Sequence, residues 1–302
     1  MGLTQPPVHD RLEVFPRPRT VESVVVSAHW ACDERRRRGL RDSWAARGAR
    51  LRGIAAPAPW TQPDGEQKGG QPACSRLAAE ARGARAGFPL KGGVLITLEG
   101  GEGSGKSTQC ALLQAWLREQ GLGVTVAREP GGTPAADRLR AVLLDRLLEP
   151  LEPVAEVLLF AASRAQTVAQ VIRPALAAGQ VVVCDRFVDS SLAYQGFGLG
   201  VDPAFILDVN ARVTGGVLPA LTLLLDLPPE EGRARKGAGG DPDRIESRGI
   251  AYHQSVRAGY LALAAADPGR FCVLDAQRHV DAVQEQVRYH VRATLAARGR
   301  FP

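Results

Sequence analysis

The stretch VLITLEGGEGSGKS, residues Val94 to Ser107, decides the fold. Its first five residues form an apolar run of the kind found in a strand that is covered on both faces of a parallel sheet. The pattern Gly100-x-x-x-x-Gly105-Lys106-Ser107 follows and fits a phosphate-binding loop at every fixed position. Apolar residues at helical spacing come next, so the sequence predicts a strand, a phosphate loop and a helix in succession.

The glycines of this loop let the backbone turn so that successive N–H groups point at phosphate oxygens, and the N-terminus of the following helix adds positive charge. We expect Lys106 to bridge the β- and γ-phosphates of ATP and the Ser107 hydroxyl to ligate Mg²⁺. Asp185, at the end of a later strand, is a second candidate that would hold Mg²⁺ through water. The predicted ATP-binding residues are Gly100, Gly101, Glu102, Gly103, Ser104, Gly105, Lys106, Ser107 and Thr108.

Strands and helices alternate along the rest of the chain. Apolar runs predict further strands at 124–127, 181–184, 221–225 and 271–274. Helical patterns cover 106–119, 137–146, 153–178, 203–213, 250–265 and 280–297. This alternation predicts one α/β domain over residues 91–302, with a five-stranded parallel sheet and helices on both faces.

The excess of positive charge lies in the first 90 residues. They hold 15 basic and 9 acidic side chains, and the difference of +6 equals the net charge of the whole chain. Residues 1–90 are rich in Arg, Ala, Gly and Pro and lack hydrophobic periodicity, so we expect a largely disordered extension or upstream sequence from a misplaced start codon. A nucleic-acid-binding arm around Arg35–Arg38 is disfavoured, because no aromatic or zinc-ligand pattern accompanies it.

Composition excludes several other classes of protein. The chain has 45% hydrophobic residues but no run long enough to span a membrane, and Met1–Asp10 lacks the basic-then-apolar order of a secretory signal. Its 5 cysteines are scattered, which argues against a disulfide framework or a zinc site and fits a reducing compartment. These features favour a cytoplasmic protein without a membrane partner.

Arginine-bearing motifs follow two of the predicted strands, at the sheet edge where ligands of open α/β sheets bind. They are Arg128-Glu-Pro-Gly-Gly-Thr133 and Asp185-Arg186-Phe187. A kinase that moves a phosphoryl group between anionic nucleotides needs several such cations to neutralise the transferring group. The guanine-binding signature [NT]-K-x-D is absent, which weakens a GTPase interpretation.

Several blocks together resemble bacterial thymidylate kinases. They are EGGEGSGKSTQ at 99–109, REPGGT at 128–133, LLFAASR at 158–164, DR at 185–186, SSLAYQG at 190–196 and DRIE at 243–246. The resemblance covers about residues 92–297. It implies transfer of the γ-phosphoryl group of ATP to dTMP, giving dTDP and ADP for dTTP synthesis, with Mg²⁺ as cofactor and a homodimer as the assembly.

The resemblance also implies roles at the acceptor site. Arg128 would bind the 5′-phosphate of dTMP, Phe160 would stack on thymine and Arg164 would bond a base oxygen. Ser191 and Gln195 would meet the pyrimidine edge, while Tyr194 would crowd the 2′ position of the sugar. The full predicted dTMP-binding set is Glu102, Arg128, Phe160, Arg164, Arg186, Ser191, Tyr194 and Gln195.

Residues 232–246 combine basic side chains with glycines and are expected to form a mobile lid. Thymidylate kinases place a catalytic arginine either in the phosphate loop or in the lid. Because position 103 is Gly, the chain resembles the form in which the lid supplies it, from Arg233 or Arg235. The predicted catalytic set is Lys106, Arg186, Arg233, Arg235 and Glu102.

Two alternatives stay open at this point. Another pyrimidine or deoxynucleoside kinase could use the same fold, and comparing phosphoryl acceptors would separate it from a dTMP kinase. A nucleic-acid-binding protein could instead use the basic N-terminal third and keep the ATP site for regulation.

Overall fold

The computed structural model describes residues 92–148, 150–237 and 242–301, all within the second of the two units of the chain, residues 62–302. The expected extension at 1–90, and its boundary, lie outside the described residues. The elements are β1 Val94–Glu99, α3 Lys106–Glu119, β2 Val124–Arg128, α4 Pro134–Leu144, α5 Pro153–Thr167, η1 Val168–Ile172, α6 Arg173–Ala177, β3 Val181–Asp185, α7 Val188–Ser191, η2 Leu192–Phe197, α8 Pro203–Thr214, β4 Leu221–Asp226, α9 Pro229–Lys236, α10 Ile250–Ala266, β5 Phe271–Asp275 and α11 Val280–Ala296.

The five strands form one parallel sheet in the order β2-β3-β1-β4-β5, which confirms the predicted fold class. β1 is central, and its residue Ile96 is in register with Val183 of β3 and Leu221 of β4. After β1 the chain forms β2 and β3 on one side of β1 and then β4 and β5 on the other side. The direction in which strands are added therefore reverses beside β1. In open α/β sheets ligands bind at such a switch point, beyond the carboxyl ends of the strands.

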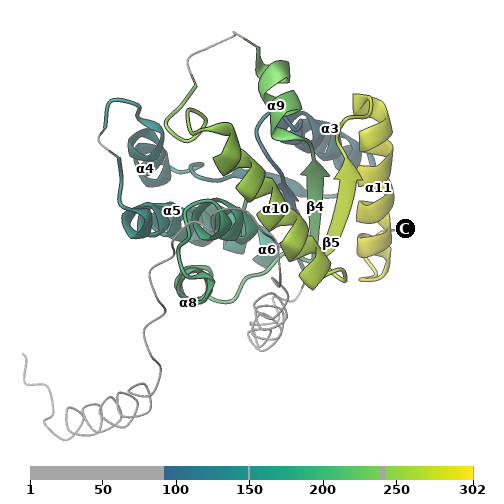
Figure 1. The fold of residues 1–302 in the computed structure, drawn as a ribbon. Helices are drawn as coiled ribbons and strands as arrows, with labels where there is room; N and C mark the ends of the chain where they lie inside the picture. Colours follow the sequence, from purple (N-terminus) through teal and green to yellow (C-terminus); the bar gives the residue numbers. More distant parts are fainter. Residues whose placement is uncertain (1–91, 149, 238–241, 302) are drawn as a thin grey trace, which may run out of the picture. The chain divides into compact units, whose positions relative to one another are not determined.

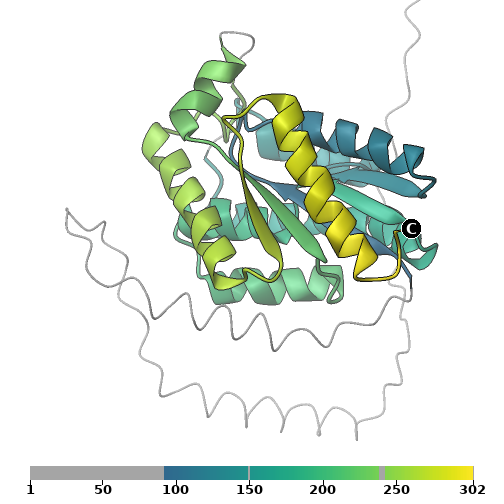
Figure 2. The same ribbon diagram turned by 90° about the vertical axis from the view of Figure 1, so that its right-hand side faces the viewer.

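Helices cover both faces of the sheet (Figures 1 and 2). Alternate residues of β1 face opposite ways: Ile96 and Leu98 pack in the cluster with α3 and α11, whereas Leu95 packs with η1 and α6. A third cluster joins α5, η2, α8 and α10 to Leu224 of β4. Burying each of these large aliphatic side chains contributes about 1.5–3 kcal/mol, so the sheet is firmly held between its two helical layers.

Helix α4 begins earlier than the predicted 137–146, because Thr133 caps it. The Thr133 hydroxyl accepts a hydrogen bond from the Ala136 amide at 3.2 Å, and Pro134 occupies the first turn, where its missing N–H has no cost. The predicted helix 153–178 is the continuous run α5, η1 and α6, which ends at Ala177.

Two helical segments were not predicted. Residues 188–197 form α7 and the π-helix η2, although Gly196 and the glycines that follow at 198 and 200 favour a turn. The expected lid begins inside the second segment, helix α9. This helix has Glu230 and Glu231 in its first turn and three basic residues in its last, a distribution that complements the helix dipole. The segment expected to form the lid is therefore helical up to Lys236.

Within the described parts of the chain, no helix combines the length and the apolar character that crossing a bilayer requires.

Candidate active site

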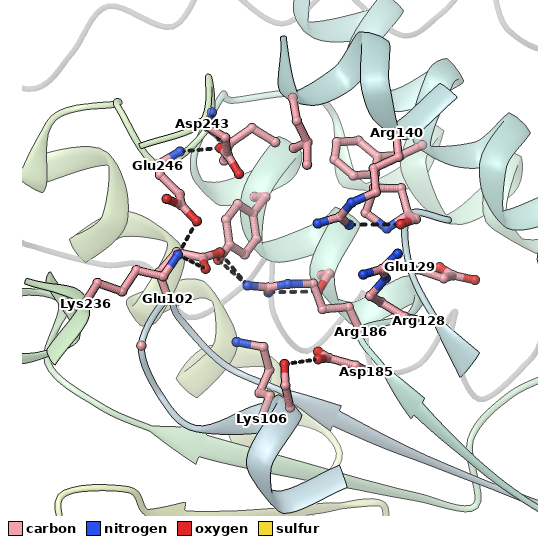
Figure 3. Close-up of a pocket in the computed structure, with 18 of the residues that line it drawn as sticks. Glu102, Lys106, Arg128, Glu129, Arg140, Asp185, Arg186, Lys236, Asp243 and Glu246 are labelled. Carbon is pink, nitrogen blue, oxygen red and sulfur yellow. Dashed lines mark hydrogen bonds and ion pairs between the residues drawn. The ribbon is translucent and has the colours of Figure 1, made fainter. Parts of the chain in front are cut away.

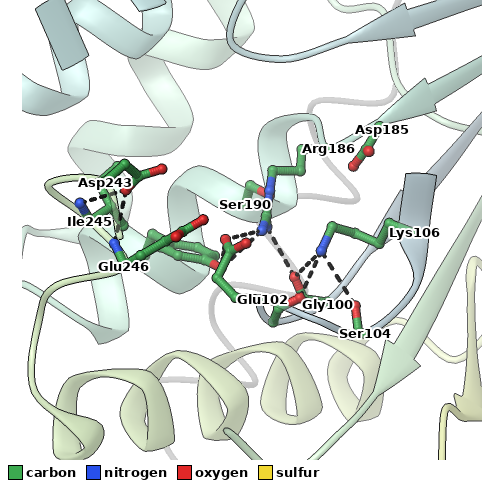
Figure 4. Close-up of polar contacts among 12 residues, drawn as sticks. Gly100, Glu102, Ser104, Lys106, Asp185, Arg186, Ser190, Asp243, Ile245 and Glu246 are labelled. Atoms are coloured by element: carbon green, nitrogen blue, oxygen red, sulfur yellow. Dashed lines mark hydrogen bonds and ion pairs between the residues drawn. The ribbon is translucent and has the colours of Figure 1, made fainter. Parts of the chain in front are cut away.

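The phosphate loop joins β1 to α3 and wraps around the Lys106 ammonium group. Lys106 is 7% exposed, and its Nζ donates to the carbonyl oxygens of Gly100 at 3.1 Å and Gly101 at 2.7 Å and to Ser104 Oγ at 3.3 Å (Figure 4). Burial and the nearby charge of Arg186 lower the pKa of Lys106 to about 8. A phosphate group at the loop would offset both effects, since it would supply negative charge and hydrogen-bond acceptors.

Ser107 and Asp185 lie together at the ends of α3 and β3. Ser107 Oγ donates to Asp185 Oδ2 at 2.9 Å, so two oxygen ligands of the kind Mg²⁺ prefers share one point beside the loop (Figure 3). Among the described residues there is no group of three or more His, Cys, Asp or Glu side chains that could hold a metal. Two oxygens suit an ion that takes its remaining ligands from phosphates and water.

Arg186 occupies the centre of the site in a left-handed backbone conformation, with φ of 68°. Its Nη2 donates to Glu102 Oε1 at 2.6 Å and to Tyr194 Oη at 3.1 Å, and its Nη1 donates to the Gly100 carbonyl at 3.0 Å. Burial disfavours ionisation of Glu102, but the charges of Arg186, Lys106 and Lys236 outweigh it and hold its pKa well below the usual range. The guanidinium is thus fixed between the phosphate loop and η2.

A cavity of about 470 Å³ extends from the phosphate loop past Arg186 to the motif after β2. Arg128 and Arg140 lie beside each other in it (Figure 3), and Arg140 Nη1 donates to the Pro130 carbonyl at 2.9 Å. Burial and the charge of Arg128 lower the pKa of Arg140. This crowding of cations creates a second place where an anionic group would be stabilised.

Comparisons with known proteins agree with this geometry. The model of the thymidylate kinase family matches residues 98–287. The thymidylate kinase of Deinococcus radiodurans is 52% identical over 195 residues, which cover 65% of this chain and 94% of the relative. That of Symbiobacterium thermophilum is 49% identical over 207 residues, covering 68% and 96%. The crystal structure of thymidylate kinase from Ehrlichia chaffeensis superposes with a TM-score of 0.55 at 31% identity, over 66% of this chain and 99% of that one.

The chain belongs to the thymidylate kinase family.

Most of the residues that the resemblance to thymidylate kinases singled out surround one cavity. Lining it are Glu102, Gly103, Gly105, Lys106, Ser107, Thr108, Arg128, Phe160, Asp185, Arg186, Ser191, Tyr194, Gln195 and Arg235. Gly100, Gly101 and Ser104 belong to the same loop and bind Lys106 from behind. Arg164 and Arg233 are the two predicted residues that lie elsewhere.

Arg164 is buried behind the cavity. Its guanidinium donates to Glu129 Oε2 at 2.6 Å, to Ser191 Oγ and the Phe187 carbonyl at 3.0 Å each, and to Asn210 Oδ1. These bonds use four of the five N–H groups of an arginine. The described arrangement makes Arg164 first of all a support for the Ser191 hydroxyl.

The two candidate lid arginines lie on α9 but point to different places. Arg235 lines the cavity at the phosphate loop, whereas Arg233 lines a neighbouring hollow and its Nη2 donates to the Arg248 carbonyl at 3.4 Å. Lys236 reaches farther in: its Nζ contacts Glu102 Oε2 at 3.4 Å and also pairs with Glu246.

Sequence reasoning missed Arg140 and Lys236 as site residues. Arg140 was placed on a predicted helix, and nothing in its local pattern marks it as facing the cavity. Lys236 was recognised as part of a basic segment, but only the close packing of α9 on the phosphate loop shows that it reaches Glu102. Both residues are brought to the site by tertiary contacts rather than by a local motif.

Proposed function

We propose that the chain transfers the γ-phosphoryl group of ATP to dTMP, giving dTDP and ADP, as a step toward dTTP. Membership of the thymidylate kinase family supports this reaction. The observation that carries it is the form of the cavity, which has a phosphate loop at one end, Arg128 and Arg140 at the other, and Arg186 between them. Two anionic nucleotides would meet there with their phosphates facing Arg186.

In this proposal the protein acts by positioning and by charge. The oxygen of the acceptor phosphate is already an anionic nucleophile, so no general base is needed. Lys106 and Arg186 would stabilise the charge that spreads over the transferring group, and Glu102 keeps the Arg186 guanidinium in place through the 2.6 Å ion pair. Arg128 and Arg140 would hold the acceptor phosphate in line.

Ser107 and Asp185 would hold Mg²⁺ beside the phosphate loop, and their hydrogen-bonded oxygens are suited to that ion. When bound, Mg²⁺ neutralises charge on the β- and γ-phosphates.

The remaining side chains would select the acceptor. Phe160 offers a flat apolar surface for the base, and Ser191 and Gln195 offer polar atoms at its edge. Tyr194 is 5% exposed and its ring is fixed over the Arg186 guanidinium, at 4.9 Å from centroid to Cζ. A fixed ring at the sugar would leave no room for a 2′-hydroxyl, which favours deoxyribose.

The end of α9 would close the site over the phosphates. Arg235 is the better placed of the two candidate catalytic arginines, because it lines the cavity with Lys236. Exclusion of water at this point would limit hydrolysis of ATP. We further propose a homodimer and a cytoplasmic location, which the resemblance and the unpatterned cysteines support; sedimentation velocity tests the dimer.

A screen of phosphoryl acceptors tests the function. Purified full-length chain with Mg·ATP is given dTMP, dUMP, CMP, dCMP or thymidine, and ADP formation is followed. We expect dTMP to be turned over with the highest kcat/KM. Turnover of another acceptor in preference to dTMP would overturn the proposal. The variant Lys106→Ala is the control and should lose about a hundred- to a thousandfold in kcat, in line with removal of a main electrostatic group.

A further inference from the structure

Glu156 is a fully buried carboxylate on α5 that no step of the proposed reaction uses. Its Oε1 accepts a hydrogen bond from Gln195 Nε2 at 2.9 Å. Its Oε2 accepts from Arg248 Nη2 at 2.6 Å and from Arg244 Nη2 at 2.9 Å. The carboxylate therefore joins η2, which carries a candidate base-reading residue, to the segment before α10.

The two guanidinium groups keep Glu156 ionised. Burial alone would disfavour the charged form, but the hydrogen bonds from Arg248 and Gln195, together with the charges of Arg248 and Arg244, outweigh it and lower the pKa of the carboxyl. An ionised carboxylate can only accept hydrogen bonds.

This restriction fixes the orientation of the Gln195 side chain. An amide carries its oxygen and its nitrogen on opposite branches, and only the nitrogen can donate to Glu156. Gln195 lines the cavity although it is only 1% exposed, so the amide has little freedom to rotate. The amide oxygen is then the group left to meet a base in the cavity.

We propose that Glu156 is a positioning residue that sets base specificity, because it turns the Gln195 amide so that an acceptor faces the pyrimidine edge. The inference rests on the proposed function. Thymine and uracil carry a donor at N3, whereas cytosine carries an acceptor there. A fixed acceptor would therefore pair with thymine and repel cytosine, and a site with a fixed polar partner discriminates strongly against a ligand that leaves it unpaired.

The first test replaces Glu156 by a residue of the same shape that can donate as well as accept. In Glu156→Gln the Gln195 amide is free to take either orientation. The ratio of the inhibition constant of dCMP to the KM of dTMP should fall by roughly tenfold, the factor that one hydrogen bond of ordinary strength supplies. The KM for ATP should stay within about twofold, since the donor site does not contact Glu156. Glu152→Gln, an exposed change of the same kind at the start of α5, is the matched control and should leave the ratio unchanged.

A double-substitution cycle separates positioning from general support. If Glu156 acts through Gln195, then adding Glu156→Gln to Gln195→Ala should not change the ratio further. An equal change in both backgrounds would show that Glu156 acts by another route and would overturn the proposal.

The orientation of the amide is also tested on the unsubstituted chain, so the proposal does not depend on how well a variant folds. N3-methyl-dTMP lacks the N3 donor and should bind at least about tenfold more weakly than dTMP. Equal binding of the two would overturn the proposal even if dTMP is the preferred acceptor. Failure of the unsubstituted chain to phosphorylate dTMP would instead contradict the proposed function, so the two failures are distinguishable.

Discussion

At the scale of single residues, the most unusual group is the buried carboxylate of Glu99 at the end of β1. It is 0% exposed and accepts hydrogen bonds from the Phe187 amide at 2.7 Å, Ser190 Oγ at 2.6 Å and Tyr260 Oη at 2.9 Å. The same two hydroxyls accept from Arg186 Nη1, at 3.4 and 3.2 Å. Glu99 thus holds the backbone next to the left-handed Arg186 and the groups that orient its guanidinium.

Glu99 should make the stability of the fold depend on pH. Burial and the charge of Asp189 raise the pKa of its carboxyl from 4.5 to about 7. The native state then binds the proton more tightly than the unfolded chain, so the stabilisation is complete below about pH 4.5 and is lost as pH rises through about 7. In Glu99→Gln this part of the pH dependence should vanish.

Urea unfolding between pH 4.5 and 8 measures the effect. The free energy of unfolding of the unsubstituted chain should decline with pH more steeply than that of the variant, by at most about 1.4 kcal/mol per pH unit for one group. Glu119→Gln, at the exposed end of α3, should keep the original slope. Parallel curves for Glu99→Gln and the unsubstituted chain would contradict the assignment.

At the scale of elements, the contact between α9 and the phosphate loop explains why position 103 is glycine. A Cβ atom on Gly103 would lie 2.3 Å from the Gly232 carbonyl oxygen, and one on Gly232 would lie 2.2 Å from the Glu102 carbonyl oxygen. Gly103 also has φ of 70°, which disfavours a side chain. An arginine at position 103 is incompatible with this packing, which supports the proposal that the end of α9 supplies a further cation.

Gly232→Ala should therefore push α9 away from the phosphate loop. Because a backbone carbonyl cannot swing aside as a side chain can, the helix itself must shift. A displacement of about 1 Å at catalytic groups can cost up to a hundredfold in rate, so we expect kcat to fall by tenfold or more while the KM for dTMP changes little. Steady-state kinetics with each substrate varied would show this.

Ala234→Ser is the matched control, since it lies on the exposed face of the same helix and should leave kcat within about twofold. If Gly232→Ala kept its full kcat, the position of α9 over the loop would not matter for turnover.

The strands were easier to predict than some of the helices, for a physical reason. A buried parallel strand such as β1 or β3 is a continuous apolar run, and that signal is local. Segment 188–197 is helical because it packs against Glu99 and against α10 side chains that include Tyr260. Its own sequence, with two serines and Gly196, favours a turn. The position of α9 likewise depends on close backbone packing, which no sequence periodicity reports.

At the scale of the whole molecule, the sequence motifs predicted which residues line the site better than they predicted the hydrogen bonds and ion pairs between those residues. Most of the predicted residues line one cavity because parallel strands end at the same edge of the sheet. The pairing of Arg164 with Glu129 depends on how α5 packs beside the segment after β2, and that of Glu156 with Gln195 depends on how α5 packs against η2. Such pairings cross 35 and 39 residues of chain, so local spacing cannot reveal them.

The kinase activity should reside entirely in residues 91–302. The family match covers residues 98–287, and the Deinococcus radiodurans relative is accounted for over 94% of its own length by 195 residues of this chain. Every group assigned to the reaction lies on the sheet, on the helices that cover it or on the loops that join them. A protein that starts at Lys91 should therefore retain kcat and both KM values within about twofold, as substitutions remote from a site do.

The first third of the chain carries the excess of basic side chains, so DNA binding is the property to compare between the full-length and the shortened protein. Full-length and shortened proteins are compared in their affinity for duplex DNA over a range of salt concentrations. If residues 1–90 contact phosphates, the affinity of the full-length chain should fall steeply with salt, and that of the shortened protein should not. The logarithm of the binding constant should then fall linearly with the logarithm of the salt concentration, with a slope near −0.9 per contacted phosphate. Loss of kinase activity in the shortened protein would contradict the division of the chain. Retained activity together with salt-dependent DNA binding by the full chain would assign the arm a separate role, and mass spectrometry of the N-terminus in cells would show whether that arm is made.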